Sequence, residues 1–189
     1  MKSALLMVLL SAVALASFGP PVRIDHEYRP DHSCINVAIT VGPGAPSSQP
    51  LYVAFQSDSV VGGFPGVHAF YDVMFQKSTD GGMTWLDTAM LIRRGARFAS
   101  GPDITTDPEG NVYIGWRDWD WYADTTGDTI RRNLCVRSSD GGTTWTVPAR
   151  VDDRPDSTKD DVDGPQIAAD SAGNLFCAWG DGRTGSDHI

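Results

Sequence analysis

The sequence of 189 residues has little positive charge. Lys and Arg together number 15 against 24 Asp and Glu, which gives a formal net charge of −9. A chain with this balance gains nothing from counterion release at a phosphate backbone, and no cluster of basic residues resembles a nucleic-acid footprint. We therefore expect no nucleic-acid partner.

Cysteine is scarce as well, and the three residues present are Cys34, Cys135 and Cys177. They form no Cys-x-x-Cys motif and stand at no metal-ligand spacing from a histidine, so we expect no zinc site and no metal cofactor. The odd number leaves at least one thiol unpaired within the chain. Because Cys135 and Cys177 lie in apolar, strand-like segments, we expect buried thiols there.

Long apolar runs are absent except at the N-terminus. Lys2 precedes a run of Ala, Leu, Val and Met that ends at the small residues Ala14 and Ala16. This order is that of a secretory signal peptide, so we expect residues 1–16 to be cleaved and the mature chain to be secreted, periplasmic or on the cell surface. The run is short for a membrane span and Pro20 follows it, so we expect no membrane segment after cleavage. An uncleaved anchor is the alternative.

Sustained helical periodicity is missing from the rest of the chain. The 20 glycines and 12 prolines separate short runs rich in Val, Ile, Tyr, Phe and Trp. Such runs are typical of short β-strands joined by tight turns. We therefore expect an all-β fold.

Two motifs recur at a spacing of about 60 residues, which indicates a repeated supersecondary unit. STDGGMTW at 78–85 returns as SSDGGTTW at 138–145, a lag of 60. GPDITTDPEGNVYIGWRD at 101–118 returns as GPQIAADSAGNLFCAWGD at 164–181, a lag of 63. A weaker first copy, LYVAF at 51–55, precedes VYIGW by 61 residues.

Each unit reads as four antiparallel strands, and a repeated unit of this kind is a propeller blade. In the middle unit we expect a turn at 107–111, where Gly110 takes positive φ, between strands near 102–105, 112–116, 131–137 and 146–151. We expect residues 17–189 to form the N-terminal part of a β-propeller, with two full blades and the start of a third, at about 24–93, 94–151 and 152–189. By the period, a further strand and a third box would follow residue 189.

The repeated octapeptide contains the groups that a hairpin needs to hold its own turn together. A short carboxylate accepts from the N–H groups of the turn, hydroxyls extend the network, glycine allows positive φ, and tryptophan buries a large apolar face. We expect structural roles here, with catalysis or calcium binding by the aspartates as the alternative. The positions are Ser78, Asp80, Gly82, Thr84 and Trp85 in one copy and Ser138, Asp140, Gly142, Thr144 and Trp145 in the other.

With these two octapeptides and the segments GNVYIGWRD and GNLFCAWGDGR, the chain resembles the Asp-box (BNR) repeat proteins, which include the sialidases and sialidase-like β-propellers. The resemblance covers roughly residues 23–189. It implies that the Asp boxes lie at the turn between the third and fourth strands of a blade, on the periphery and away from any active site.

In an up-and-down blade the end opposite the boxes is then the candidate binding face. The loop RDWDWYADTTGDTIRR at 117–132 mixes aromatic rings with charges, which suits sugar stacking and hydroxyl recognition; a solvated loop is the alternative. We expect the acidic connection at 152–164 to be a solvated segment; calcium bound through its clustered oxygens is the alternative, although its spacing is not that of an EF-hand. The candidate binding residues are Arg117, Asp118, Trp119, Trp121, Tyr122, Arg131 and Arg183.

The resemblance implies a sialidase-like glycoside hydrolase, of exo-sialidase type, that acts on sialylated or related glycans. Active members use a Tyr nucleophile and three arginines on the substrate carboxylate. Here Val22-Arg23-Ile24-Asp25 lacks the aromatic residue and the proline of the expected Phe/Tyr-Arg-Ile-Pro motif and matches the linker at 150–152, so Arg23 reads as a repeat feature and no catalytic residue is assigned. The alternatives are a non-catalytic propeller that binds glycans or cell-surface proteins, and a structural repeat module of a larger secreted protein.

Overall fold

The computed structural model of the protein describes residues 22–24, 34–45, 48–59, 70–93, 98–120, 130–153 and 162–182. These residues form an all-β structure without a helix. Accordingly, this part of the chain has no helix long and apolar enough to span a bilayer. The expected signal peptide, residues 1–16, lies outside the described residues.

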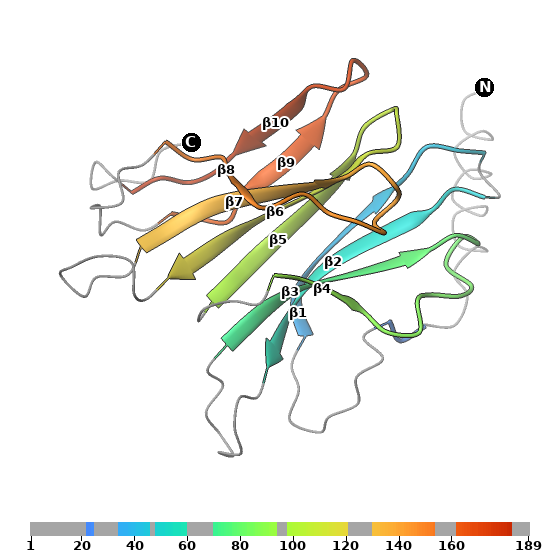
Figure 1. Cartoon of the computed structure of the whole chain (residues 1–189), viewed down its shortest axis with the longest axis horizontal. Coiled ribbons are helices and arrows are strands. Elements are labelled where there is room, and N and C mark those ends of the chain that lie inside the picture. Colours follow the sequence, from blue (N-terminus) through green and yellow to red (C-terminus); the bar gives the residue numbers. More distant parts are fainter. Residues whose placement is uncertain are drawn as a thin grey trace, which may run out of the picture.

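Ten strands form two four-stranded antiparallel units and one hairpin (Figure 1). Among the described residues, units 1 and 2 share one parallel strand pairing, Tyr71 with Phe98. We therefore treat them as two separate sheets. Unit 1 comprises β1 (Cys34–Val41), β2 (Leu51–Ser59), β3 (Phe70–Ser78) and β4 (Met90–Arg93). Unit 2 comprises β5 (Phe98–Thr106), β6 (Val112–Asp120), β7 (Ile130–Ser138) and β8 (Ala149–Arg150), and unit 3 comprises β9 (Gln166–Ala169) and β10 (Leu175–Ala178).

The three units lie in sequence order with their first strands adjacent. β5 contacts β1 and β2, and β9 contacts β5, so unit 2 lies between unit 1 and unit 3 (Figure 1). None of the sheets closes on itself among the described residues. The expectation of an all-β fold with four-stranded antiparallel units is therefore confirmed for units 1 and 2.

The main core fills the space between units 1 and 2. Trp116 and Phe75 are fully buried there, and the burial of one such side chain stabilises the fold by roughly 2–3 kcal/mol. The core residues are Tyr52, Ala54, Val73 and Phe75 from unit 1 and Ala99, Ile104, Val112, Ile114, Trp116 and Val136 from unit 2. These two sheets are thus held together chiefly by apolar contact between their faces.

A smaller cluster lies on the other face of unit 1. Val53 and Phe55 are buried there with Met74 and Ala89, and Trp85 packs against them. Successive residues of a strand point to opposite faces, so β2 sends Tyr52 and Ala54 to one cluster and Val53 and Phe55 to the other. This is why LYVAF is apolar at every position instead of alternating.

The strand expected at 146–151 is wrong in length, because β8 covers only Ala149–Arg150. The Thr146 N–H still donates to the Arg137 carbonyl at 2.9 Å, so pairing begins where the pattern predicts it. Pro148 has no N–H and interrupts the ladder between these two points.

The thiols of Cys135 and Cys177 do not form a disulfide. Cys135 is buried, and burial raises the pKa of its thiol to about 12. Cys177 is partly buried, and burial again raises its thiol pKa. The expectation of buried thiols is confirmed for Cys135 and only in part for Cys177.

Candidate functional site

One end of the molecule, which we call the turn end, gathers the tight turns of all three units. The turns after β1, β5 and β9 line one open hollow of about 330 Å³, to which they contribute Gly42, Pro108 and Ser171. The ring of Tyr52 lies against Gly42 and its hydroxyl against Gly141, so the second Asp box lies at the same end. The expected placement of these turns at one end is thus observed.

Each Asp-box carboxylate accepts hydrogen bonds from its own turn. Asp140 accepts from the N–H groups of Thr143 and Thr144 at 2.9 and 2.8 Å, from the Ser138 hydroxyl at 2.7 Å and from the Thr144 hydroxyl at 2.6 Å. The first box repeats the pattern, with Asp80 accepting from the Thr84 N–H and hydroxyl. These contacts use the oxygen atoms of both carboxylates inside the turn.

The same hydrogen bonds lower the pKa values of both carboxyl groups. The Thr84 hydroxyl and N–H, together with the Ser78 hydroxyl, lower the pKa of Asp80 to about 2. The corresponding bonds from Thr144 and Ser138 lower the pKa of Asp140 further. Both groups are therefore charged at neutral pH, which suits an acceptor in a turn and does not suit a general acid.

The turns between the first and second strands of units 2 and 3 use the same chemistry; the turn at 107–111 was expected, but its Asp–Asn hydrogen bonds were not. Asp107 accepts from the N–H and the side-chain amide of Asn111 at 2.8 and 2.6 Å. Asp170 accepts from the same two groups of Asn174 at 2.9 and 2.8 Å. The signal was present as D-x-x-G-N in DPEGN and DSAGN, in which Gly110 has the expected positive φ, 85°.

The other end, which we call the arginine end, is held by contacts between distant segments. The Arg93 Nε of β4 donates to Asp118 Oδ2 of β6 at 2.9 Å, and the Asp118 side chain is 5% exposed. This ion pair links unit 1 to unit 2. Asp118, one of the expected binding residues, therefore points into the boundary between the two units.

Arg117 and Arg131, two further expected binding residues, flank the indole of Trp119. Their guanidinium carbons lie 4.8 and 4.5 Å from its ring centroid, within the range of cation–π attraction. Arg117 also donates to the Val162 carbonyl at 2.9 Å and to the Ser100 hydroxyl at 3.3 Å. Arg117 thereby fixes the segment that leads into unit 3.

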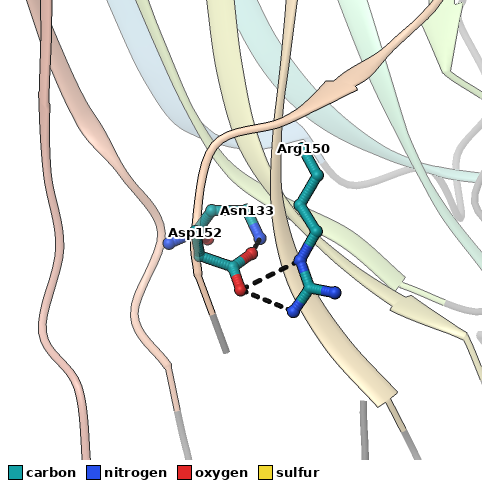
Figure 2. Close-up of polar contacts among 3 residues, drawn as sticks. All are labelled: Asn133, Arg150 and Asp152. Carbon is teal, nitrogen blue, oxygen red and sulfur yellow. Dashed lines mark hydrogen bonds and ion pairs between the residues drawn. The ribbon is translucent and has the colours of Figure 1, made fainter. Parts of the chain in front are cut away.

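Arg150 and Asp152 form a second ion pair at the edge of unit 2 (Figure 2). Asp152 Oδ1 accepts from Arg150 Nη2 at 2.7 Å and from Nε at 3.1 Å. Its Oδ2 accepts from the buried Asn133 N–H at 2.6 Å. The side chain of Asp152 has no exposed surface, so this carboxylate fixes both the β7 backbone and the Arg150 guanidinium.

Three arginines line one open hollow of about 510 Å³ between units 1 and 2. We call it the arginine hollow; its lining is Arg93 of β4, Arg132 and Leu134 of β7, and Pro148 and Arg150 beside β8. Asp118 holds the guanidinium group of Arg93, and Asp152 holds that of Arg150. Sequence reasoning did not find this site. Its signal was a recurring linker, LIRR at 91–94 and ARVD at 149–152, which contains Arg93 in one copy and Arg150 in the other.

Several expectations fall outside the described residues. These are the candidate binding residues Trp121, Tyr122 and Arg183, and most of the acidic connection considered for calcium. Within the part of the chain that the structure describes, no group of three or more His, Cys, Asp or Glu side chains is arranged to hold a metal ion.

No protein-family model matches the chain, and no curated protein is similar to it.

Proposed function

We propose that this chain is part of an exported, sialidase-like Asp-box β-propeller that binds anionic glycans in the arginine hollow. The observation that carries the proposal is that three arginines, from β4, β7 and β8, line one open hollow. Such a site is notable in a chain with a net charge of −9, since most of its surface repels anions.

The stacking of the units supports the propeller. Four-stranded antiparallel units follow one another with their first strands adjacent, which is how blades are arranged around a propeller axis. The Asp boxes lie in the turn between the third and fourth strands of units 1 and 2, as in the proteins that the sequence resembles.

The chemistry of the hollow suits a carboxylate-bearing sugar. Guanidinium groups recognise carboxylates through paired, charge-assisted hydrogen bonds. Because Asp118 and Asp152 hold Arg93 and Arg150, those two cations lose little conformational entropy when a ligand binds. Leu134 and Pro148 supply apolar surface for the carbon face of a sugar ring.

Binding is a better proposal than hydrolysis. A glycosidase of the usual kind keeps one carboxyl group protonated near neutral pH by raising its pKa. The pKa values of Asp80, Asp107, Asp140 and Asp170 are all lowered, through hydrogen bonds within their turns, so none of these four carboxyl groups suits that role. They also lie at the turn end, away from the arginine hollow.

Titration calorimetry with sialyllactose, and with neutral lactose for comparison, tests the proposal. We expect the full chain to bind sialyllactose and not lactose, and Arg132→Gln to weaken binding about tenfold or more, through loss of a charge-assisted hydrogen bond. Arg131→Gln is the matched control. It removes the same charge from the adjacent residue of β7, whose guanidinium group lies over the Trp119 ring.

The two variants separate the possible surfaces. Loss of binding in Arg131→Gln alone would place the ligand beside Trp119 and overturn the arginine hollow. Equal losses in both variants would indicate non-specific attraction to positive charge. Absence of binding by the full chain, folded by circular dichroism, would reject the function, and release of sialic acid would replace binding with hydrolysis.

A further inference from the structure

Cys135 lies on the face of unit 2 that is turned toward unit 3. It pairs with Gly115 of β6, just as Phe75 of β3 pairs with Ala54 of β2 in unit 1. Phe75 is buried between units 1 and 2, and Cys135, which is 7% exposed, occupies the equivalent position one unit later. The next residue of β7, Val136, belongs to the core on the side of unit 1, and successive strand residues point to opposite faces.

Cys177 lies on the face of unit 3 that is turned toward unit 2. It pairs with an isoleucine of the first strand, at a register position that recurs in the three units as the pairs Ile39–Val53, Ile104–Ile114 and Ile167–Cys177. Ile104 and Ile114 are buried against unit 1. Ile167 is 8% exposed and lies against unit 2, where a Cβ added to Gly115 would be 3.2 Å from its Cγ2 atom. Paired residues of a ladder share a face, so Cys177 is directed toward unit 2 as well.

The two cysteines thus occupy the positions of Phe75 and Ile114, which belong to one buried cluster between units 1 and 2. The strand order agrees with this placement, because β9 packs on β5 and β6 while β10 and β7 lie one strand further along their sheets. Burial and, after it, the charge of a Cys177 thiolate raise the pKa of the Cys135 thiol to about 12. The two sulfur atoms are therefore close enough to interact.

Small residues allow units 2 and 3 to approach each other closely. At this boundary Gly115 stands where unit 1 has an alanine, and Cys135 stands where unit 1 has a phenylalanine. A Cβ added to Gly164 would lie 2.8 Å from the Gly101 carbonyl oxygen, so the backbones of the two units are in contact there. A disulfide needs Cα atoms about 4.4–6.8 Å apart, less than the roughly 10 Å between ordinary packed sheets. The small side chains at this boundary permit that separation.

We infer that Cys135 and Cys177 form a cross-linking site, at which an oxidising environment joins unit 3 to unit 2 through a disulfide bond. Both thiols are free in the structure, which is therefore the reduced form. In the described part of the chain unit 3 is a two-stranded hairpin, and such a hairpin has little stability of its own. The disulfide closes a loop of about 40 residues and holds this hairpin against unit 2. The inference does not depend on the proposed ligand.

Thiol–disulfide exchange with a small-molecule disulfide supplies the oxidation. Cys177 is the less buried thiol, so its thiolate attacks one sulfur of oxidised glutathione, forms a mixed disulfide and releases one glutathione thiolate. The Cys135 thiolate then attacks the Cys177 sulfur of the mixed disulfide and releases the second glutathione thiolate. The two protons of the cysteines pass to the two glutathione thiolates, and the two electrons of the protein thiols reduce one glutathione disulfide.

Incubation of the full chain with oxidised glutathione, followed by tryptic peptide mapping without reductant, tests the inference. We expect one linked pair of peptides, containing Cys135 and Cys177, and loss of two of the three free thiols. The linked chain should melt about 5–10 °C higher than the reduced chain, and Cys135→Ser and Cys177→Ser should each abolish this rise. Cys34→Ser is the matched control and should cross-link like the unmodified chain, since Cys34 packs on the smaller cluster of unit 1.

Three results would overturn the inference. Three free thiols after the incubation would show that the two cysteines do not meet. A lasting glutathione adduct on Cys177 would show that Cys135 does not reach it. A linked pair that contains Cys34, or that joins two chains, would show a different arrangement of the thiols. The peptide map of the unmodified chain decides between these results even where a serine variant fails to fold, and circular dichroism verifies the fold of each variant.

Discussion

The carboxylates of the turn end and of the arginine end make contacts of different range. At the turn end, the Asp140 carboxylate bonds only groups within four residues of it in the sequence. At the arginine end, Asp118 bonds Arg93, which is 25 residues away. The units also contact each other at the turn end, where Lys77 Nζ donates to the Gly141 carbonyl at 3.1 Å. The box carboxylates are thus organised by local geometry, whereas the ion pair of Asp118 depends on how the two units pack.

This difference in contact range assigns a structural role to the Asp-box turns and leaves the arginine end as the candidate functional site. A turn whose acceptors are used by its own N–H and hydroxyl groups offers few sites to a ligand. The arginine end presents the guanidinium groups of Arg93 and Arg150, which Asp118 and Asp152 hold beside the arginine hollow. The Asp boxes therefore stabilise the turns of units 1 and 2, while the arginine end is where we propose that a ligand binds.

The largest expected effect is at Gly142, where a box meets the core of the neighbouring unit. An added Cβ would lie 2.4 and 2.5 Å from Phe75 ring atoms, at a φ of +85°. Gly142→Ala should lower the free energy of unfolding by about 3 kcal/mol or more, through overpacking and backbone strain. In the first box, the added Cβ of Gly82→Ala would lie 3.3 Å from Leu51 and 3.9 Å from Trp85, so this variant should cost about half as much.

Urea denaturation of both glycine variants measures the difference. Equal decreases in the free energy of unfolding would show that the second box acts only within its own turn and that Phe75 does not contribute to the effect. The ring of Trp145 packs edge-to-face on Phe75 at 5.1 Å, so the contact between box and core is already close in the native protein.

A smaller effect is expected at Asp152. Asp152→Ala removes the acceptor of the buried Asn133 N–H and the partner of Arg150, and should lower the free energy of unfolding by about 2–3 kcal/mol. Asp87→Ala is the control; its side chain is exposed, so the change should stay within about 0.5 kcal/mol. Similar values for the two variants in urea denaturation would show that the ion pair does not hold the arginine end.

The smallest effect is the acid response of the first box. The pKa of Asp80 is lowered from 3.8 to about 2 in the folded chain, so its stabilising contribution is complete above pH 4 and is lost as the pH falls towards 2. Asp80→Asn should therefore show a weaker decline of unfolding free energy over that interval than the unmodified chain. Asp87→Asn, an exposed carboxyl outside the box, controls for the loss of one charge; equal slopes for Asp80→Asn and the unmodified chain would contradict the prediction.

The accuracy of sequence reasoning follows the same division between the ends. The strands and the turns around Gly110 and the two boxes were predictable, because their determinants lie within a few adjacent residues. The expected strand at 146–151 overlooked the interruption of pairing at Pro148, although the sequence contained its cause, since proline lacks the N–H that the ladder needs. The pairing of Arg93 with Asp118 was not, because it depends on how two sheets lie against each other.

By itself, the sequence determined the all-β class, the repeat of about 60 residues and the chemistry of the Asp boxes, since each of these depends on local spacing and local hydrogen bonds. Only the tertiary structure decided which faces are covered. The isoleucines Ile39, Ile104 and Ile167 stand at equivalent positions, yet the first is exposed and the other two are buried. Whether such a residue is buried depends on the unit that packs against it, and the sequence repeat alone does not show which units pack together.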